Sequence, residues 1–390
     1  MNDTTAMKKI GILVERQRGY GRKLCEGIVR FARERNDWSL KFIEFSELRQ
    51  DIRRNMYDGF IARAMNDGIT KTLSSIGKPV VDVFFEKSVP GFAAVDQNAL
   101  VVGQMAARHF IEHHFTNFAF CGYNGRSYSD GRRNGFARSL ELNHFRCSLY
   151  STPRIALKDF EDSVVMHEHF GMPSDARQLL KWLRGLPKPV AIFCAHDMRA
   201  YQVSEICRAN GIHVPEDVAI LGVDDDELVC QFTDPPISSI DQNPVGIGYA
   251  AAESLQKMFD KPGVVPPPVR VKPLKLIERG STRIYPLSPP WLSDALVFIR
   301  ANITKNITAA DVYTHVGKSH TLVDKAFRQK LGTSVQKEIS KTRLTEAKRL
   351  VQTTSMPLKS IAKASGFSSL QYFSSSFTAA FGSSPSSFRQ

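Results

Sequence analysis

Short runs of β-branched and other apolar residues alternate with longer segments of helical period through the first 282 residues. The runs include IGILV, DGFIA, PVVDV, NFAFCGY, PVAIFCA and VAILGVDD. Between them lie segments such as LCEGIVRFARE, in which Leu24, Ile28 and Phe31 are spaced i, i+4, i+7 and share one helix face. Strands that alternate with helices form parallel sheets covered by helices. Because this region is too long for one small doubly wound unit, we expect two α/β lobes.

A proline-rich stretch, VVPPPVRVKPLKLIERGSTRIYPLSPPW, ends the alternating pattern. Proline favours extended chain and cannot extend a helix, so we expect a last strand or two followed by a linker. The predicted boundaries are a two-lobed α/β domain over 1–282, a linker over 283–290 and a second domain over 291–390. The six cysteines lack CxxC spacing and lie mostly in apolar runs, which is typical of reduced, packed thiols.

The region after the linker shows only helical period and contains two similar segments. The first, ITAADVYTHVGKSHTLVDKAFRQKLG, predicts a short helix, a turn at Gly317 and a second helix capped by Ser319. We expect the buried stripe of that second helix to comprise Leu322, Ala326 and Phe327.

The second segment repeats this order about fifty residues later. We expect a short helix from Pro357 bearing Ile361 and Ala362, and a turn at Gly366. The next helix then begins after Ser369 and turns three phenylalanines inward, Phe373, Phe377 and Phe381. A connecting helix from Val335 to about Thr353, with a core stripe of Leu344, Ala347 and Val351, joins the two segments. The pattern predicts an all-α domain with two helix-turn-helix motifs, spaced to reach successive major grooves. An unrelated helical bundle is the alternative.

The positive charge of the chain is concentrated in the same region. The net charge is +13, and the residues from Pro286 onward contain 14 Lys and Arg against 5 Asp and Glu. A concentrated basic surface favours a polyanionic partner such as duplex DNA over a merely solubilising face.

The C-terminal segment GFSSLQYFSSSFTAAFGSSPSSFR resembles the DNA-binding domain of the AraC family of transcription activators. The resemblance covers roughly the last 100 residues, about the length of a typical domain. It implies base-reaching positions at Thr321, Asp324, Lys325, Gln371 and Ser375, and phosphate contacts from Arg343 and Lys348. In this chain three serines, 374 to 376, stand in the second recognition helix where the family often has basic residues.

Polar residues follow several of the apolar runs in the first 282 residues. In parallel sheets, ligands bind beyond the carboxyl ends of the strands, so these residues are candidates for a cleft between the lobes. They are Asp197, Asp224, Gln242 and, in YSDGRRNGF, Arg132, with Tyr20 to cover a sugar face. Carboxylates, an amide and a guanidinium in one cleft can bind vicinal hydroxyls. The alternative for each is a structural role, such as an aspartate that caps a helix.

The segments CAHDMRA, VPEDVAILGVDD and YSDGRRNGF resemble the LacI/GalR-type sensor, which shares the periplasmic-binding-protein-like fold. His196, which we count among the ligand-binding candidates, stands where asparagine is usual in that family. The combination of this sensor with a C-terminal AraC-type unit resembles the bacterial regulators of xylose operons. That resemblance implies a homodimer that binds D-xylose and repeated operator half-sites and activates xylose catabolism, with RNA polymerase as a further partner. We expect a cytoplasmic location because the sequence shows neither a signal-peptide pattern nor a run of about 18 apolar residues. Another sugar or a purine remains an alternative effector.

Other classes of function have weaker support. GIGYAAA superficially matches a dinucleotide-binding loop but lacks a leading strand and an acidic partner about twenty residues on. His109 and His113 have the i,i+4 spacing of a metal pair, although a solvated helix face also explains them. We expect no enzymatic activity, cofactor, metal or membrane span. A transport-linked binding protein is disfavoured by the basic C-terminal region and by a start, MNDTTAMKKIGILVERQ, that lacks a signal-peptide pattern.

Overall fold

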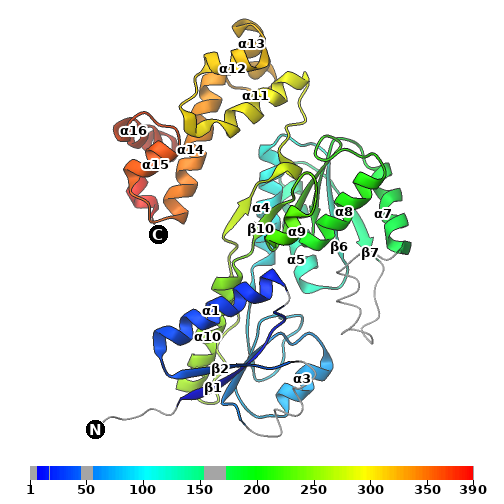
Figure 1. Cartoon of the computed structure of the whole chain (residues 1–390), viewed down its shortest axis with the longest axis vertical. Helices are drawn as coiled ribbons and strands as arrows, with labels where there is room; N and C mark the ends of the chain where they lie inside the picture. The colour runs from blue at the N-terminus through cyan, green and yellow to red at the C-terminus, as the bar shows by residue number, and fades with distance from the viewer. Residues whose placement is uncertain (1–6, 17, 45–55, 153–172, 390) are drawn as a thin grey trace. The chain divides into compact units, whose positions relative to one another are not determined.

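The computed structural model describes residues 7–16, 18–44, 56–152 and 173–389, which form two compact units. Unit 1 spans Met1–Thr282 and unit 2 spans Arg283–Gln390. Figure 1 shows the mixed α/β composition of unit 1 and the helical composition of unit 2. Part of the segment expected to be a linker packs within unit 2, because the Tyr285 side chain is buried in the core of that unit.

The first lobe of unit 1 contains a six-stranded sheet in the order β11-β5-β4-β3-β1-β2, with every pair parallel. Its strands are β1 (Lys8–Leu13), β2 (Trp38–Phe42), β3 (Gly59–Ala62), β4 (Val80–Asp82), β5 (Phe92–Gln97) and β11 (Val269–Val271). Its helices are α1 (Gly19–Arg35), α3 (Asp67–Ser74) and α10 (Pro244–Asp260).

Helices α1 and α10 lie side by side although more than two hundred residues separate them in the sequence (Figure 1). Two glycines allow this approach, since a Cβ at Gly27 would lie 2.0 Å from the Val245 carbonyl oxygen and one at Gly248 would lie 1.9 Å from that of Leu24. The predicted stripe of Leu24, Ile28 and Phe31 is buried against this core, as expected.

The second lobe contains a six-stranded sheet in the order β12-β10-β9-β8-β6-β7, in which only β12 runs antiparallel. Its strands are β6 (Phe118–Tyr123), β7 (Cys147–Thr152), β8 (Val190–Cys194), β9 (Val218–Val223), β10 (Ser238–Asp241) and β12 (Lys275–Ile277). Its helices are α4 (Ala99–Glu112), α5 (Ser127–Glu141), α7 (Pro173–Gly185), α8 (Asp197–Ala209) and α9 (Glu227–Gln231). The chain passes between the lobes after β5, β10 and β11. Unit 1 is thus the two-lobed α/β domain that the sequence predicts.

Unit 2 consists of helices α11 (Pro290–Ala301), α12 (Ala309–Val316), α13 (His320–Leu331), α14 (Val335–Thr353), α15 (Leu358–Ala364) and α16 (Leu370–Phe381). α12 with α13, and α15 with α16, are the two predicted helix-turn-helix motifs. Gly317 (φ +60°) and Gly366 (φ +76°) form their turns, and the Ser319 and Ser369 side chains cap the second helices. Helix α14 contributes Ile339 to one core cluster and Ala347 to the other, so it joins the two motifs.

The structure corrects one residue of the core predicted for α13. Leu322 is 46% exposed, whereas Val323 is fully buried and occupies the inner face of α13 with Ala326 and Phe327. The segment HTLVDKAF allowed either register of the stripe. Val323 is the inner position because α13 packs against α11 and α12 in one core cluster.

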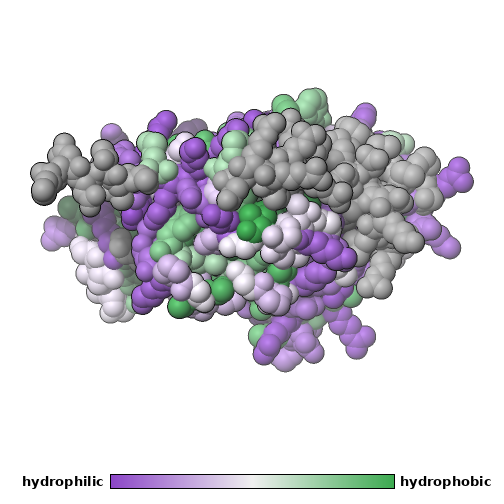
Figure 2. Space-filling view, turned by 90° about the horizontal axis from the view of Figure 1, so that it is seen from below, coloured by the Kyte–Doolittle hydropathy of each residue, from purple (hydrophilic) through white to green (hydrophobic). Residues whose placement is uncertain are grey.

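The face of the molecule drawn in Figure 2 carries many polar residues. Figure 2 shows hydrophilic residues over much of the face seen from below, with hydrophobic residues in small separate groups between them. Within the part of the chain that the structure describes, every helix is too short or too polar to cross a membrane.

Candidate functional site

A cleft lies between the two lobes of unit 1, at the carboxyl ends of their strands. It encloses about 520 Å³ of space not filled by protein atoms, part of which is open to solvent. The first lobe contributes Arg18, Tyr20, Arg63, Val83, Phe84, Asp96 and Gln97, and the second contributes Tyr128, Arg132, His196, Asp224 and Gln242. A concave site with convergent polar groups between two lobes is typical of a small-molecule binding site.

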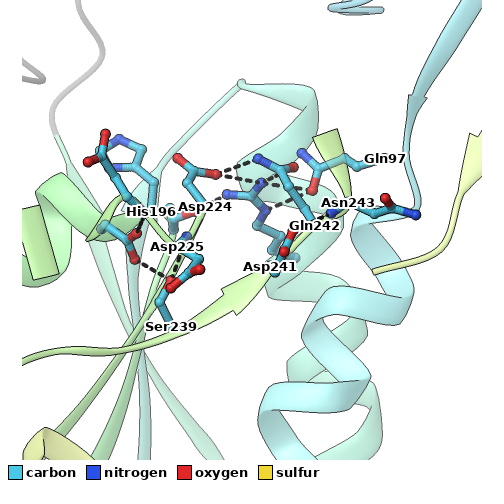
Figure 3. A network of polar contacts seen from close by, with 12 residues as sticks. Gln97, His196, Asp224, Asp225, Ser239, Asp241, Gln242 and Asn243 are labelled. Carbon is cyan, nitrogen blue, oxygen red and sulfur yellow. Dashed lines mark hydrogen bonds and ion pairs between the residues drawn. The ribbon is translucent and has the colours of Figure 1, made fainter. Parts of the chain in front are cut away.

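The Arg132 guanidinium organises the polar floor of this cleft. Arg132 is 2% exposed, and its Nη2 donates to Gln97 Oε1 at 2.7 Å and to Gln242 Oε1 at 2.9 Å. It also donates to the Ala195 carbonyl oxygen and lies 3.8 Å from the Asp224 carboxylate, which accepts a hydrogen bond from Gln242. Figure 3 shows Gln97, Asp224 and Gln242 converging on one place. Residues from both lobes therefore meet in a single hydrogen-bonded network.

Asp224 owes its position to an unusual turn after β9. Asp224 and Asp225 have positive φ angles, 113° and 47°, a region that side chains other than glycine rarely occupy. Hydrogen bonds hold the turn: Asp224 N donates to the Ile240 carbonyl and Asp225 N donates to Ser239 Oγ. Strain of this kind costs of order 1–3 kcal/mol and is concentrated at functional sites. The turn directs the Asp224 carboxylate into the cleft.

His196 presents a hydrogen-bond donor to the cleft. His196 caps α8, because its Nδ1 accepts a hydrogen bond from the Arg199 backbone N–H at 3.1 Å. In the neutral ring the proton therefore resides on the other nitrogen, Nε2. Burial, reinforced by nearby arginines, holds the pKa of His196 well below its usual range and keeps the ring neutral. Nε2 is buried and lacks a hydrogen-bond partner among the described residues. An asparagine would offer the same pair of functions, an acceptor for the cap and a donor for a ligand.

Aromatic rings flank the polar floor. The Arg63 guanidinium lies 4.6 Å from the centroid of the Phe84 ring and 5.5 Å from that of Tyr20, while Arg132 lies 5.3 Å from that of Tyr128. Cation–π contacts of this kind hold both arginines and rings in place. The cleft thus combines flat apolar surfaces with fixed polar groups.

Asp96 forms part of the wall contributed by the first lobe. Its carboxylate accepts from the Gln97 backbone N–H at 2.7 Å and from Arg270 at 3.2 Å. Burial outweighs these stabilising contacts and raises the pKa of Asp96 to about 7. The carboxyl group therefore exchanges its proton near neutral pH.

Five of the six predicted ligand-binding residues line the cleft: Tyr20, Arg132, His196, Asp224 and Gln242. The structure does not bring Asp197 there. One Asp197 carboxylate oxygen accepts from Ser239 Oγ at 2.6 Å and the other accepts from the Asp226 backbone N–H at 2.8 Å. Asp197 is 2% exposed, and through these two bonds it joins the turn between β9 and α9 to β10.

Sequence reasoning missed several lining residues, chiefly Arg63, Asp96, Gln97 and Tyr128. The rule that found Asp224 also applies to three of them, since Arg63 follows the run GFIA and Asp96 and Gln97 end the run FAAVDQ. Tyr128, in the first turn of α5, follows no strand directly and offered no comparable signal.

In unit 2, helix α13 presents an exposed basic face. Thr321 and Lys325, predicted to reach bases, are exposed on α13 near Arg328. Asp324 is engaged within the domain, because its carboxylate accepts from the Val335 backbone N–H at 3.3 Å and lies 3.1 Å from His320 Nε2. The structure thus gives Asp324 a role in joining α13 to α14.

Helix α16 presents an exposed face without charge. Gln371 and Ser375, the predicted base-reaching residues, are exposed there, and Tyr372 is 48% exposed beside them. The helix sequence LQYFSSSFTAAF contains no charged residue. The second helices of the two motifs therefore differ in charge, and α13 carries the stronger electrostatic attraction for a phosphate backbone.

The two residues predicted to contact phosphates have other environments. Arg343 is 7% exposed, and its Nη2 donates to Asn306 Oδ1 at 3.1 Å and to the Ile307 carbonyl at 2.9 Å. This corrects our assignment, because a guanidinium held inside the domain is not available to DNA. Lys348 lies over the Phe381 ring at 4.6 Å and the Phe388 ring at 5.3 Å, so it packs against the second motif.

A two-lobed domain with a polar cleft, followed by a basic domain with two helix-turn-helix motifs, defines a ligand-responsive transcription regulator. Residues 107–282 match the periplasmic binding protein-like domain family, and residues 313–390 match a helix-turn-helix domain family. The chain is a DNA-binding regulator that joins a periplasmic-binding-protein-like sensor to an AraC-type domain.

Over nearly its whole length the chain is similar to xylose operon regulatory proteins. It is 27% identical to the one from Haemophilus influenzae over 98% of both chains. It is equally identical to the one from Escherichia coli K12 over 99% of this chain and 97% of the relative. These relatives are regulators and not enzymes, in agreement with our expectation.

Solved structures give the same result. A structure described as the xylose-binding transcription activator xylR is 26% identical with a TM-score of 0.62, over 98% of both chains. A LacI family regulator from Enterococcus faecium with bound ribose shares the fold of unit 1, at 21% identity and a TM-score of 0.55 over 72% of this chain and all of that one.

By sequence, the chain is also similar to the transcriptional repressor PurR of Aliivibrio salmonicida, at 29% identity over 47% of this chain and 51% of the relative.

Proposed function

We propose that the cleft of unit 1 binds D-xylose, and that the bound sugar makes this regulator an activator of xylose catabolic genes. The observation that carries the proposal is the network around Arg132, which unites side chains of both lobes at the floor of the cleft. A pentose offers several vicinal hydroxyls, each of which both donates and accepts. Fixed carboxylate, amide and guanidinium groups suit such a ligand, and charged partners contribute about 1.5–3 kcal/mol per hydrogen bond.

Two of the three arginines that line the cleft already face carboxylates, which favours an uncharged ligand beside them. Arg132 lies beside Asp224, and Arg63 forms an ion pair with Glu15, so carboxylates already balance these two guanidinium groups. A phosphorylated or acidic sugar would have to compete with them. The flanking rings of Tyr20 and Tyr128 offer apolar surface for the C–H face of a sugar.

Contacts between the lobes next to Asp224 suggest how the sugar acts. The Gly19 backbone N–H in the first lobe donates to Asp226 Oδ2 at 3.1 Å, and Lys23 Nζ donates to the Asp225 carbonyl at 3.0 Å. A ligand that bridges the lobes stabilises the arrangement in which these bonds form, and so shifts the population toward it. The altered sensor then changes how unit 2 engages DNA.

The remaining partners belong to the same proposal. We infer that the protein acts in the cytoplasm as a homodimer, so that two pairs of helix-turn-helix motifs bind repeated half-sites of the operator. Bound there, it contacts RNA polymerase. The exposed residues of α13, Thr321 and Lys325, and those of α16, Gln371 and Ser375, are the proposed base-reaching groups.

A calorimetric titration of the full chain with a ligand panel tests the effector. The panel contains D-xylose, other aldopentoses, hexoses and purine bases, and the variant Gln242→Ala serves as a second sample, because it removes one amide of the network. We expect D-xylose to bind most tightly and Gln242→Ala to weaken that binding. A purine is the rival effector that the resemblance to LacI/GalR-type sensors left open, and tight binding of a purine alone would refute the sugar assignment.

A further inference from the structure

Three potential metal ligands meet where α4 ends and the segment after β12 begins. They are His109 on α4, His113 at the C-cap of α4, and Glu278 after β12. Their potential ligand atoms all lie within 4.8 Å of one another. His109 is 8% exposed and His113 is fully buried. The interpretation of this pair as a solvated helix face is therefore wrong, since α4 turns both imidazoles inward.

The hydrogen bonds of His113 fix which nitrogen faces Glu278. Nδ1 lies 2.7 Å from the His109 carbonyl oxygen, which only accepts, so Nδ1 carries a proton. The other nitrogen, Nε2, lies 3.6 Å from the Glu278 carboxylate. In the neutral ring, Nε2 therefore holds a lone pair on the side of the Glu278 carboxylate, and a lone pair is what an imidazole offers to a metal ion.

The separation of His113 and Glu278 suits a shared metal ion better than a direct hydrogen bond. At 3.6 Å the separation of Nε2 and the carboxylate oxygen exceeds the usual hydrogen-bond range. Ligands of a tetrahedral Zn²⁺ ion, with bonds of about 2.0–2.2 Å, lie about 3.3–3.6 Å apart. The ring centroids of His109 and His113 are 4.1 Å apart, so the two imidazoles lie side by side at the end of α4.

The surroundings supply the orienting contacts that metal-bound histidines have in proteins. Such histidines generally donate their second ring N–H to a carbonyl, a carboxylate or water, as His113 does. His109 Nε2 lies 3.2 Å from the Thr282 hydroxyl, which in turn lies 2.7 Å from Ser238 Oγ. The Glu278 side chain is 26% exposed and gives the site access to solvent.

We propose that His109, His113 and Glu278 bind a first-row divalent metal ion, with Zn²⁺ the best match to two imidazoles and one carboxylate. Water completes the tetrahedral coordination. The ion would tie α4 to residues 278–282, the last segment of unit 1 before the chain enters unit 2 at Arg283. This site lies outside the proposed sugar cleft and does not depend on the identity of the effector.

Metal titration of the full chain, freed of any histidine tag and stripped with a chelator, tests the proposal. The samples are the wild type, His113→Ala, Glu278→Gln and the control His213→Ala. His213 is a matched control because it also pairs with a carboxylate, that of Asp217 at 3.2 Å, but lies on the surface and outside the three-residue cluster. Calorimetry with Zn²⁺ gives affinity and stoichiometry, and absorption spectra with Co²⁺ report tetrahedral coordination.

We expect one Zn²⁺ per chain in the wild type and in His213→Ala, with tetrahedral Co²⁺ bands. Loss of an orienting contact costs 10–100-fold in metal affinity, so loss of a direct ligand in His113→Ala or Glu278→Gln should cost at least about 100-fold. Glu278→Gln preserves shape and guards against a folding defect in His113→Ala. Absence of stoichiometric binding in the wild type, or wild-type affinity in a folded Glu278→Gln variant, would overturn the proposal.

Discussion

Replacement of His196 separates two functions that this side chain combines. In His196→Ala, the cap of α8 and the buried Nε2–H donor are both lost. In His196→Asn, the amide oxygen can take over the cap and the amide nitrogen can take over the donor. The two variants therefore distinguish a structural role of His196 from a role in ligand binding.

The expected magnitudes follow from these contacts. Loss of a helix cap costs about 0.5–2 kcal/mol of stability. Loss of a neutral hydrogen bond to a ligand costs about 0.5–1.5 kcal/mol, which is roughly a 2- to 13-fold weaker affinity. We therefore expect His196→Ala to show both effects and His196→Asn to recover most of each. Because the pKa of His196 lies well below its usual range, neither effect should depend on protonation of this ring at neutral pH.

Urea unfolding measures the stability of each variant, and calorimetric titration with D-xylose measures its affinity. The reasoning fails if His196→Ala loses stability but keeps wild-type affinity, since Nε2–H would then make no contact with the sugar. It also fails if His196→Asn is as stable as the wild type but binds as weakly as His196→Ala.

Three further predictions concern other parts of the chain. Because the pKa of Asp96 is higher in the folded chain than in the unfolded chain, the protonated carboxyl group stabilises the fold. This stabilisation is complete below pH 3.8 and is lost as the pH rises through 7, which lowers the unfolding free energy by up to about 4 kcal/mol. Asp96→Asn should flatten the dependence of unfolding free energy on pH between 4 and 8, and an unchanged slope would contradict this. Lys325→Ala should weaken operator binding by about 1–3 kcal/mol in a gel-shift assay, with losses at particular base pairs, and full affinity would exclude this contact. Alanine at Gly366 or Gly382 must adopt a left-handed φ, at a cost of about 1–2 kcal/mol. Gly366→Ala should destabilise unit 2 further, because its Cβ would also lie 1.9 Å from the Ile303 carbonyl oxygen. Equal melting temperatures of the two variants would refute this prediction.

The sequence alone predicted both folds because their signals are local. Alternating strands and helices indicated the two lobes, and the repeated glycine turns and serine caps indicated the two helix-turn-helix motifs. The rule that polar residues after parallel strands meet in a cleft found Asp224 and Gln242. The rule does not say which way a side chain turns, and Asp197 turns toward the β9–α9 loop.

Two other residues show what pattern reading overlooked. Arg343 lies one helical turn from both Ile339 and Ala347, which are buried, so its inward position was readable from the period of α14. His109 and His113 likewise share the inner face of α4 with Ala106. Glu278, the third member of that cluster, comes from a distant segment of the chain, so the spacing of residues along α4 could not predict it.

The central claim is that a sugar bound in unit 1 controls how unit 2 engages DNA. Footprinting of the full chain on the DNA upstream of its own gene cluster, with and without D-xylose, tests it most directly. The account predicts protected half-sites whose occupancy or extent changes with D-xylose, and a response weakened in Gln242→Ala. The same footprint at every sugar concentration, although calorimetry shows D-xylose bound, would contradict it.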